Sequence, residues 1–394
     1  MKLNLHNNIN YHRLSIGKKL FICHGGRVLH SWFFISSFLL FTSVLLAQKN
    51  KPVSQQVMQN IYEQVKTPYK YGLVVLPPDT GKKVDCPTIY KFGNTWYMTY
   101  LVFDGRGYET WLAKSKNLLD WKTLGVQMGF TKDGWDANQK AGYNALVSTT
   151  WGSNYQLQKY KGKYWMSYFG GSTAGYEPEP LSIGMAYTNI KPSKAFYWNR
   201  LPQPVLKTDD KDVRWWENRN KLFKSYVIDD KERNTGHRFI MYYNAVGDSL
   251  PNNKPTRWYE RIGMAVSDDM EHWQRFQTNP VVHHSRGITG DPMIQKIDGV
   301  WVMFYFGAFW KGRETEAFNR FAASYDLVNW TDWEGDDLIN STVDYDKKYA
   351  HKSFVLKHKG VVYHFYCGVD AKDNRGIAVA TSVDKGKSKL SFSR

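Results

Sequence analysis

The sequence predicts an all-β fold, a five-bladed β-propeller, and two observations carry this prediction. One pattern of alternating aromatic and aliphatic residues that ends in a small residue recurs at 94–100, 162–171, 237–245, 299–308 and 360–368. Such period-two alternation is typical of a buried strand and not of a helix. The repeat length of about 60 to 75 residues leaves room for four strands, the size of one propeller blade. A large β-sandwich is the alternative, but sandwiches lack such self-similarity.

Further strands are expected before and after the central strand of each repeat. The first strands are predicted at 87–92, 155–160, 224–228, 292–297 and 353–358, and the third strands at 110–115, 183–188, 262–269, 321–326 and 377–382. A Trp follows the third strand in four of the five repeats, where an outer fourth strand would begin. With 394 residues and 42% hydrophobic composition, the chain is long enough for one large domain over 85–394.

The N-terminal segment differs in composition from the repeats. Residues 1–31 are basic, and they precede an apolar run of about 15 residues that ends in small residues. This pattern predicts a signal peptide over 1–47 and a periplasmic or secreted protein, with an uncleaved membrane anchor as the alternative.

Residues 48–84 are predicted to form an N-terminal extension with one helix and one strand. The helix carries Val57, Ile61 and Val65 on one face and ends before Pro68. The strand in "YGLVVL" (71–76) is expected to pair with the last repeat and close the ring, which removes an exposed sheet edge. Contact with a second copy through the helix would give a homodimer.

Cysteine content and charge limit the functional classes. Cys86 and Cys367 fall in the first and last repeats, so a disulfide and two buried thiols both fit the sequence. We expect no metal site and no cofactor, because CxxC and HExxH motifs are absent. The formal net charge of +17 favours an anionic substrate among oligosaccharides and polysaccharides, whereas export argues against nucleic acid.

Polar residues at the start of the first strands are candidates for a ligand site, because these positions surround the central funnel of a propeller. Asp85 in "KVDCPTI" and Asp291 in "ITGDPMI" are predicted to stand at matching places, and His351 and Lys352 begin the last repeat. Two carboxylates that face each other across a gap are what the cleavage of a glycosidic bond requires. The pattern therefore predicts a glycosidase.

Other residues near these positions are predicted to bind the sugar. Tryptophan rings stack on the apolar faces of sugars, and polar side chains bind the hydroxyl groups. The predicted substrate-binding residues are Trp151, Ser153, Asn154, Lys224, Trp310 and Lys352.

A Tyr-Glu pair recurs in three repeats and supplies rival candidates for the proton donor. The glutamates are Glu109, Glu177 and Glu260, with Glu179 close to the second of them. They could fix the geometry of the blades through ion pairs. Alternatively one of them, above all Glu177, is a catalytic carboxylic acid whose pKa is raised by burial and a nearby Asp.

Over about residues 60–385 the chain resembles the five-bladed propeller glycoside hydrolases of families 43, 32 and 117. The resemblance rests on the repeats and on "VDCPTIYKFGNTWYMTY", "GDPMI" and "AHKSFV", and it looks closest to the anhydrogalactosidases of family 117. It implies an exo-acting, inverting enzyme for plant or algal oligosaccharides. Asp85 would be the general base, Asp291 would orient the acid and raise its pKa, and His351 would donate the proton. Lys352 stands where that family has a glutamate.

Two other functions fit the same fold. A glycoside phosphorylase would need a cationic pocket for phosphate, for which Lys224, Arg286, Lys311 and Lys352 are available. A carbohydrate-binding propeller without catalysis would keep the aromatic residues and dispense with the acids.

Overall fold

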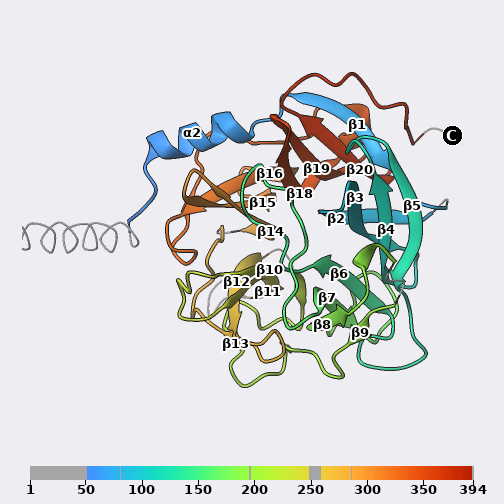
Figure 1. The fold of residues 1–394 in the computed structure, drawn as a ribbon, viewed down its shortest axis with the longest axis vertical. Coiled ribbons are helices and arrows are strands. Elements are labelled where there is room, and N and C mark those ends of the chain that lie inside the picture. Colours follow the sequence, from blue (N-terminus) through green and yellow to red (C-terminus); the bar gives the residue numbers. More distant parts are fainter. Residues whose placement is uncertain (1–50, 80, 195–196, 248–258, 285, 393–394) are drawn as a thin grey trace, which may run out of the picture. The chain divides into compact units, whose positions relative to one another are not determined.

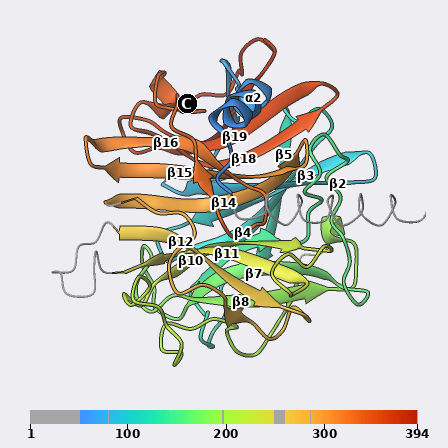
Figure 2. The same ribbon diagram turned by 90° about the vertical axis from the view of Figure 1, so that its left-hand side faces the viewer.

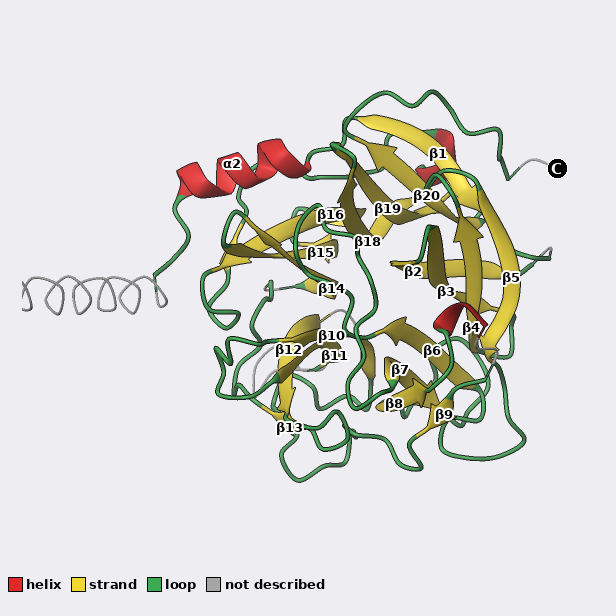
Figure 3. Cartoon of the chain, viewed as in Figure 1, coloured by secondary structure: helices red, strands yellow, loops and turns green. Residues whose placement is uncertain are grey.

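The computed structural model describes residues 51–394 except 80, 195–196, 248–258, 285 and 393–394. Most of these residues lie in β-strands, and the one α-helix among them is α2, Gln55–Val65 (Figure 3). The predicted signal peptide over 1–47 lies outside the described residues. In the described part of the chain no helix combines the length and the apolar character that crossing a bilayer requires.

Hydrogen bonding groups the strands into four sheets. The first sheet contains β2 (Lys83–Phe92), β3 (Thr95–Phe103), β4 (Tyr108–Ser115) and β5 (Trp121–Met128), and the second contains β6 (Gln139–Asn144), β7 (Tyr164–Gly171), β8 (Ser182–Thr188) and β9 (Asn199–Arg200). The third contains β18 (Tyr349–His358), β19 (Val361–Val369), β20 (Arg375–Thr381) and β1 (Tyr69–Val75).

The fourth sheet has eight strands in two antiparallel groups. One group is β10 (Leu222–Asp229), β11 (Phe239–Val246), β12 (Tyr259–Ser267) and β13 (Gln274–Arg275); the other is β14 (Gly287–Ile297), β15 (Val300–Trp310), β16 (Arg313–Ser324) and β17 (Thr331–Asp332). A short parallel pairing joins the groups, in which Tyr259 lies opposite Gly287 and Glu260 lies opposite Ile288.

The innermost strands β2, β6, β10, β14 and β18 surround a common centre (Figure 1). Each contacts the next along the chain, and β18 contacts β2, so these strands form a closed ring. Figure 2 shows the same groups from the side, with α2 at their edge. Large aromatic side chains fill the space between strands, and Trp96, Trp165 and Trp216 are among those that are fully buried.

Most predicted strands are confirmed, and one prediction is wrong. The five central strands are β3, β7, β11, β15 and β19, but residues 155–160 do not form the first strand of the second repeat. β6 takes that place. Its sequence "QKAGYN" lacks the expected aromatic and aliphatic alternation because the site is crowded: a Cβ on Gly142 would lie 2.5 Å from the sulfur of Met166.

β1 occupies the position that the sequence predicts for the ring-closing strand, since it pairs antiparallel with β20. α2 buries Met58, Ile61 and Val65, whereas Val57 of the predicted face is only half-buried. Tyr62 of α2 stacks on Trp333 with ring centroids 5.3 Å apart. The apolar face of the helix is thus covered within the chain, and the homodimer stays a prediction.

The two cysteines within the described residues are free thiols. Cys86 and Cys367 are both buried, and no disulfide joins them. Of the two alternatives that the sequence left open, the pair of buried thiols is therefore the one observed.

We predict that ring closure depends on a buried ion pair between β1 and the loop before β18. Lys70 Nζ lies 2.5 Å from Asp346 Oδ2, and the Asp346 side chain is fully buried. Lys70→Gln should lower the free energy of unfolding by about 3 kcal/mol, because it leaves a buried carboxylate without its cation. Urea denaturation measures this change. The control is Lys66→Gln, which removes an exposed pair with Glu63, and an equal loss in both variants would contradict the prediction.

Candidate active site

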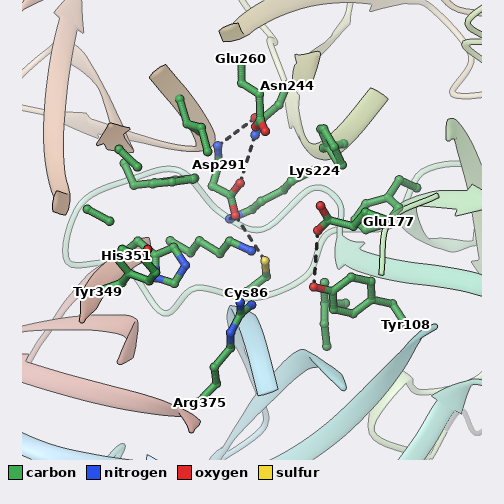
Figure 4. Close-up of a pocket in the computed structure, with 18 of the residues that line it drawn as sticks. Cys86, Tyr108, Glu177, Lys224, Asn244, Glu260, Asp291, Tyr349, His351 and Arg375 are labelled. Atoms are coloured by element: carbon green, nitrogen blue, oxygen red, sulfur yellow. Dashed lines mark hydrogen bonds and ion pairs between the residues drawn. The ribbon is translucent and has the colours of Figure 1, made fainter. Parts of the chain in front are cut away.

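A cavity of about 280 Å³ lies where the N-terminal ends of the innermost strands meet (Figure 4). Lining residues come from β2, β10, β14 and β18 and from the strands and loops next to them. Its size is close to the lower end of the ~300–1,000 Å³ that ligand pockets usually have. The cavity therefore suits a small ligand or the end of a longer one.

Three β-bulges direct side chains into this cavity. In β2, β14 and β18 two residues lie opposite one residue of the neighbouring strand. The first residue of each bulge, Cys86, Asp291 or Lys352, has a positive φ of 47°, 58° or 64°. A bulge changes the direction of a side chain, and strained backbone of this kind in residues other than glycine gathers at functional sites. All three side chains line the cavity.

The bulges correct one prediction from the sequence. Asp85, Gly290 and His351 are the residues before the bulges, whereas Asp291 is equivalent to Cys86. Asp85 and Asp291 therefore do not stand at matching places. The proline that follows both Cys86 and Asp291 is the sequence signal that gives this alignment.

Asp85 is buried below the cavity and is not one of the residues that line it. Its Oδ2 lies 2.6 Å from Lys352 Nζ and 3.4 Å from Arg375 Nη1. Burial alone would raise the pKa of Asp85, but these two cations outweigh burial and hold the pKa well below its ordinary value. The carboxylate thus stays charged and is bound by two cations.

Asp291 is held by contacts on both carboxylate oxygens. Oδ1 accepts a hydrogen bond from Asn244 Nδ2 at 3.1 Å, and Oδ2 accepts one from the Cys86 thiol at 3.3 Å. Lys224 Nζ lies 3.7 Å from Oδ2. The Lys224 side chain is only 2% exposed, and its ammonium has no hydrogen-bond acceptor among the described residues. It can therefore donate to a ligand in the cavity.

Glu177 and Glu260 project into the cavity from different elements (Figure 4). Glu260 begins β12, and Glu177 lies in the loop before β8 with a φ of 51°. Burial, and then the negative charges of Glu177 and Asp291, raise the pKa of Glu260 to about 8. Burial also raises the pKa of Glu177, while Lys352 opposes that rise. At neutral pH the pair therefore holds one proton, which resides mainly on Glu260.

His351 lines the cavity in an uncharged form. Burial, followed by the charge of Lys352, lowers its pKa to about 4. Nδ1 lies 3.2 Å from the carbonyl oxygen of Cys367, which can only accept, so Nδ1 carries the proton of the neutral ring. Ligand atoms of Asp85, His351 and Cys367 lie within 4.8 Å of one another, but a metal ion there would have to displace the two cations that already bind Asp85.

Four of the predicted substrate-binding residues do not line the cavity. Trp151 donates its backbone N–H to Lys296, near the opposite end of β14, and Ser153 and Asn154 follow it in the same loop. Trp310 lies outside the cavity wall, where its ring stacks on His284. Lys224 and Lys352 do line the cavity.

Several residues of the cavity were not in the predicted site. They are Cys86, Tyr108, Tyr143, Tyr176, Asn244, Glu260 and Arg375. The recurring Tyr-Glu pair was the available signal for Glu260, although the third member, Glu109, does not line the cavity and accepts a hydrogen bond from Trp111. Arg375 had no such signal, because it reaches the site only when the last strands meet the first.

Comparison with known proteins gives a consistent result. No protein-family model matches the chain, and no curated protein matches it. A solved structure described as a glycoside hydrolase is 50% identical, with a TM-score of 0.83, over 87% of this chain and 99% of its own. A structure described as a complex of BT0996 and RGII gives the same values.

A more distant structure, a thermostable family-43 glycoside hydrolase, is 16% identical with a TM-score of 0.52, over 81% of this chain and 96% of its own. This likeness concerns the fold alone, which is an all-β fold of the propeller type. The nearer resemblance to family 117, and the histidine acid that it implies, stay predictions. Because half of the aligned residues match over nearly the whole of the first relative, the chain belongs to the glycoside hydrolases.

Proposed function

We propose that the protein is an exo-acting, inverting glycosidase in which Glu260 is the general acid and Glu177 the general base. The observation that carries the proposal is the raised pKa of Glu260, about 8, beside a second carboxyl group in the same cavity. Glycosidases need one carboxyl group that keeps its proton and another that is ionised. This assignment replaces Asp85 and His351 as base and acid.

In the proposed reaction Glu260 protonates the glycosidic oxygen as the bond to the anomeric carbon breaks. Glu177 takes a proton from a water molecule, whose oxygen attacks the anomeric carbon from the opposite face of the sugar. No hydrogen bond joins the two carboxyl groups among the described contacts, which leaves room for this water. Lys352 and Arg375 favour the ionised form of Glu177, so their charge supports its role as base.

Asp291, Asn244 and Lys224 are proposed to bind the hydroxyl groups of the terminal sugar. Asp291 is a fixed acceptor, and Lys224 offers buried donors that have no acceptor yet. A small cavity that closes around one sugar favours cleavage at chain ends. Asp85 is assigned a positioning role through Lys352 and Arg375, and His351 a place in the wall as a neutral ring.

The fold is proposed to be a five-bladed propeller. The closed ring of inner strands supports this count if the two antiparallel groups of the largest sheet are separate blades. For the substrate, the relative whose structure is described with RGII favours a plant oligosaccharide of that kind. A screen of plant and algal oligosaccharides that includes fragments of RGII tests the function. We expect release of a monosaccharide with inverted configuration, detected by proton NMR, without any need for phosphate.

The first mutational prediction concerns the two glutamates. Glu260→Gln should lower turnover of natural oligosaccharides by ~10² to 10⁴, with a much smaller effect on aryl glycosides, whose leaving groups need little protonation. Glu177→Gln should impair both substrates equally. Glu109→Gln is the control, since this glutamate belongs to the same Tyr-Glu repeat but does not line the cavity. Full activity of Glu260→Gln on natural substrates would exclude it as the acid.

The pH dependence of kcat/KM gives a second prediction. Activity should fall as the pH rises through about 8, because Glu260 then loses the proton that it must donate. It should also fall at acidic pH, at a value above the ordinary glutamate pKa, because Glu177 becomes protonated.

Asp85→Asn distinguishes the two assignments of the base. The charge of Asp85 raises the pKa of Glu177, so its removal should move the acidic limb of the profile to lower pH while both limbs remain. If Asp85 is itself the base, the acidic limb should disappear from the profile of this variant.

A further inference from the structure

One wall of the cavity is apolar. It consists of Ile288, Phe306, Ala308, Phe309, Ala317 and Tyr349. The Tyr349 hydroxyl is the only polar side-chain group in this set. These residues come from β14, β15, β16 and the start of β18, so the wall forms one continuous surface over neighbouring strands.

The wall is fixed from behind by Trp310. The register of β15 against β16 shifts between Ala308 and Trp310, and Phe309 at the shift has a φ of 58°. This bulge directs the Phe309 ring toward the cavity and the Trp310 ring away from it. Trp310 Nε1 donates to the carbonyl oxygen of Ile288 at 2.8 Å. A Cβ on Gly307 would lie 2.6 Å from the Trp310 ring, which shows how closely this ring supports the wall.

The remaining lining differs sharply from this wall. Glu177, Lys224, Asn244 and Glu260 supply donors and acceptors there. A sugar carries hydroxyl groups around its ring, and a hydroxyl group pressed against the apolar wall would lose water without gaining a partner. A methyl group in the same place would instead gain from burial. The cavity therefore distinguishes sugars by what they present to this wall.

We propose that the wall receives a methyl group of the bound sugar, so that the substrate class is methyl-bearing sugars, either 6-deoxy sugars or methyl ethers. This inference rests on the proposed function, because it takes the cavity as the site of the terminal sugar. The expected preference over the matching hydroxyl sugar is ~10- to 10²-fold, the range that apolar pockets reach against an added hydroxyl group.

Ligand-observed NMR titration of the wild-type protein tests the proposal. The probes are methyl glycosides in matched pairs: L-rhamnose with L-mannose, L-fucose with L-galactose, and each hydroxyl sugar with its 2-O-methyl ether. We expect at least one methyl-bearing member to bind 10-fold or more tightly than its partner, with the strongest saturation transfer to its methyl protons. The first two pairs report a C-methyl group and the ethers report an O-methyl group. Equal binding within every pair, or no binding of any methyl-bearing member, would overturn the proposal.

Substitutions at Ala317 supply matched controls. Ala317→Ser places a hydroxyl group in the wall and should reduce the preference to 3-fold or less. Ala317→Cys adds a side-chain atom of similar size but weaker polarity and should retain the preference. If serine leaves the preference unchanged, the wall does not contact the methyl group. Because binding is measured without turnover, failure of the oligosaccharide screen would contradict the proposed catalysis and leave this preference as a separate result.

Discussion

A buried ion-pair cluster at the junction of the first and last repeats is the interaction on which the site depends. Asp85 comes from β2, whereas Lys352 and Arg375 come from β18 and β20. A carboxylate in the interior needs compensating charge, and here both cations are supplied from the opposite end of the chain. The cluster can form only when the ring closes. Assembly of the fold and the electrostatics of the cavity are therefore one event.

This cluster also determines which acids of the cavity keep a proton. Because Lys352 and Arg375 are bound to Asp85, their charge stabilises the neighbouring Glu177 more than the more distant carboxyl group of Glu260. Burial and two nearby carboxylates then act on Glu260 with little compensation, and its pKa rises to about 8. Carboxyl groups of one chemical type thus acquire different protonation states from their surroundings alone.

The sequence predicted the parts of the fold that follow from local pattern. Alternating aromatic residues located all five central strands, and the apolar strand at 71–76 located the segment that pairs with β20. The pattern failed at β6, where close packing at the centre favours Ala141 and Gly142 over the aromatic residues that mark a strand. The irregular segment at 155–160 matches the strand pattern better than β6 does, and this error moved Trp151, Ser153 and Asn154 into the predicted site.

The site itself was harder to predict because it depends on single-residue register. A bulge shifts which residue faces the cavity by one position, so Asp85 and Asp291 looked equivalent in sequence while Cys86 and Asp291 are equivalent in space. The repeats supply the same backbone device in β2, β14 and β18, but the residue at the bulge is a thiol, a carboxylate and an ammonium. Repetition of the fold therefore fixes where side chains enter the cavity, and divergence between the repeats makes the cavity asymmetric. An asymmetric site can bind one sugar in one orientation, which is the condition for placing a proton donor and a base on opposite sides of a single bond.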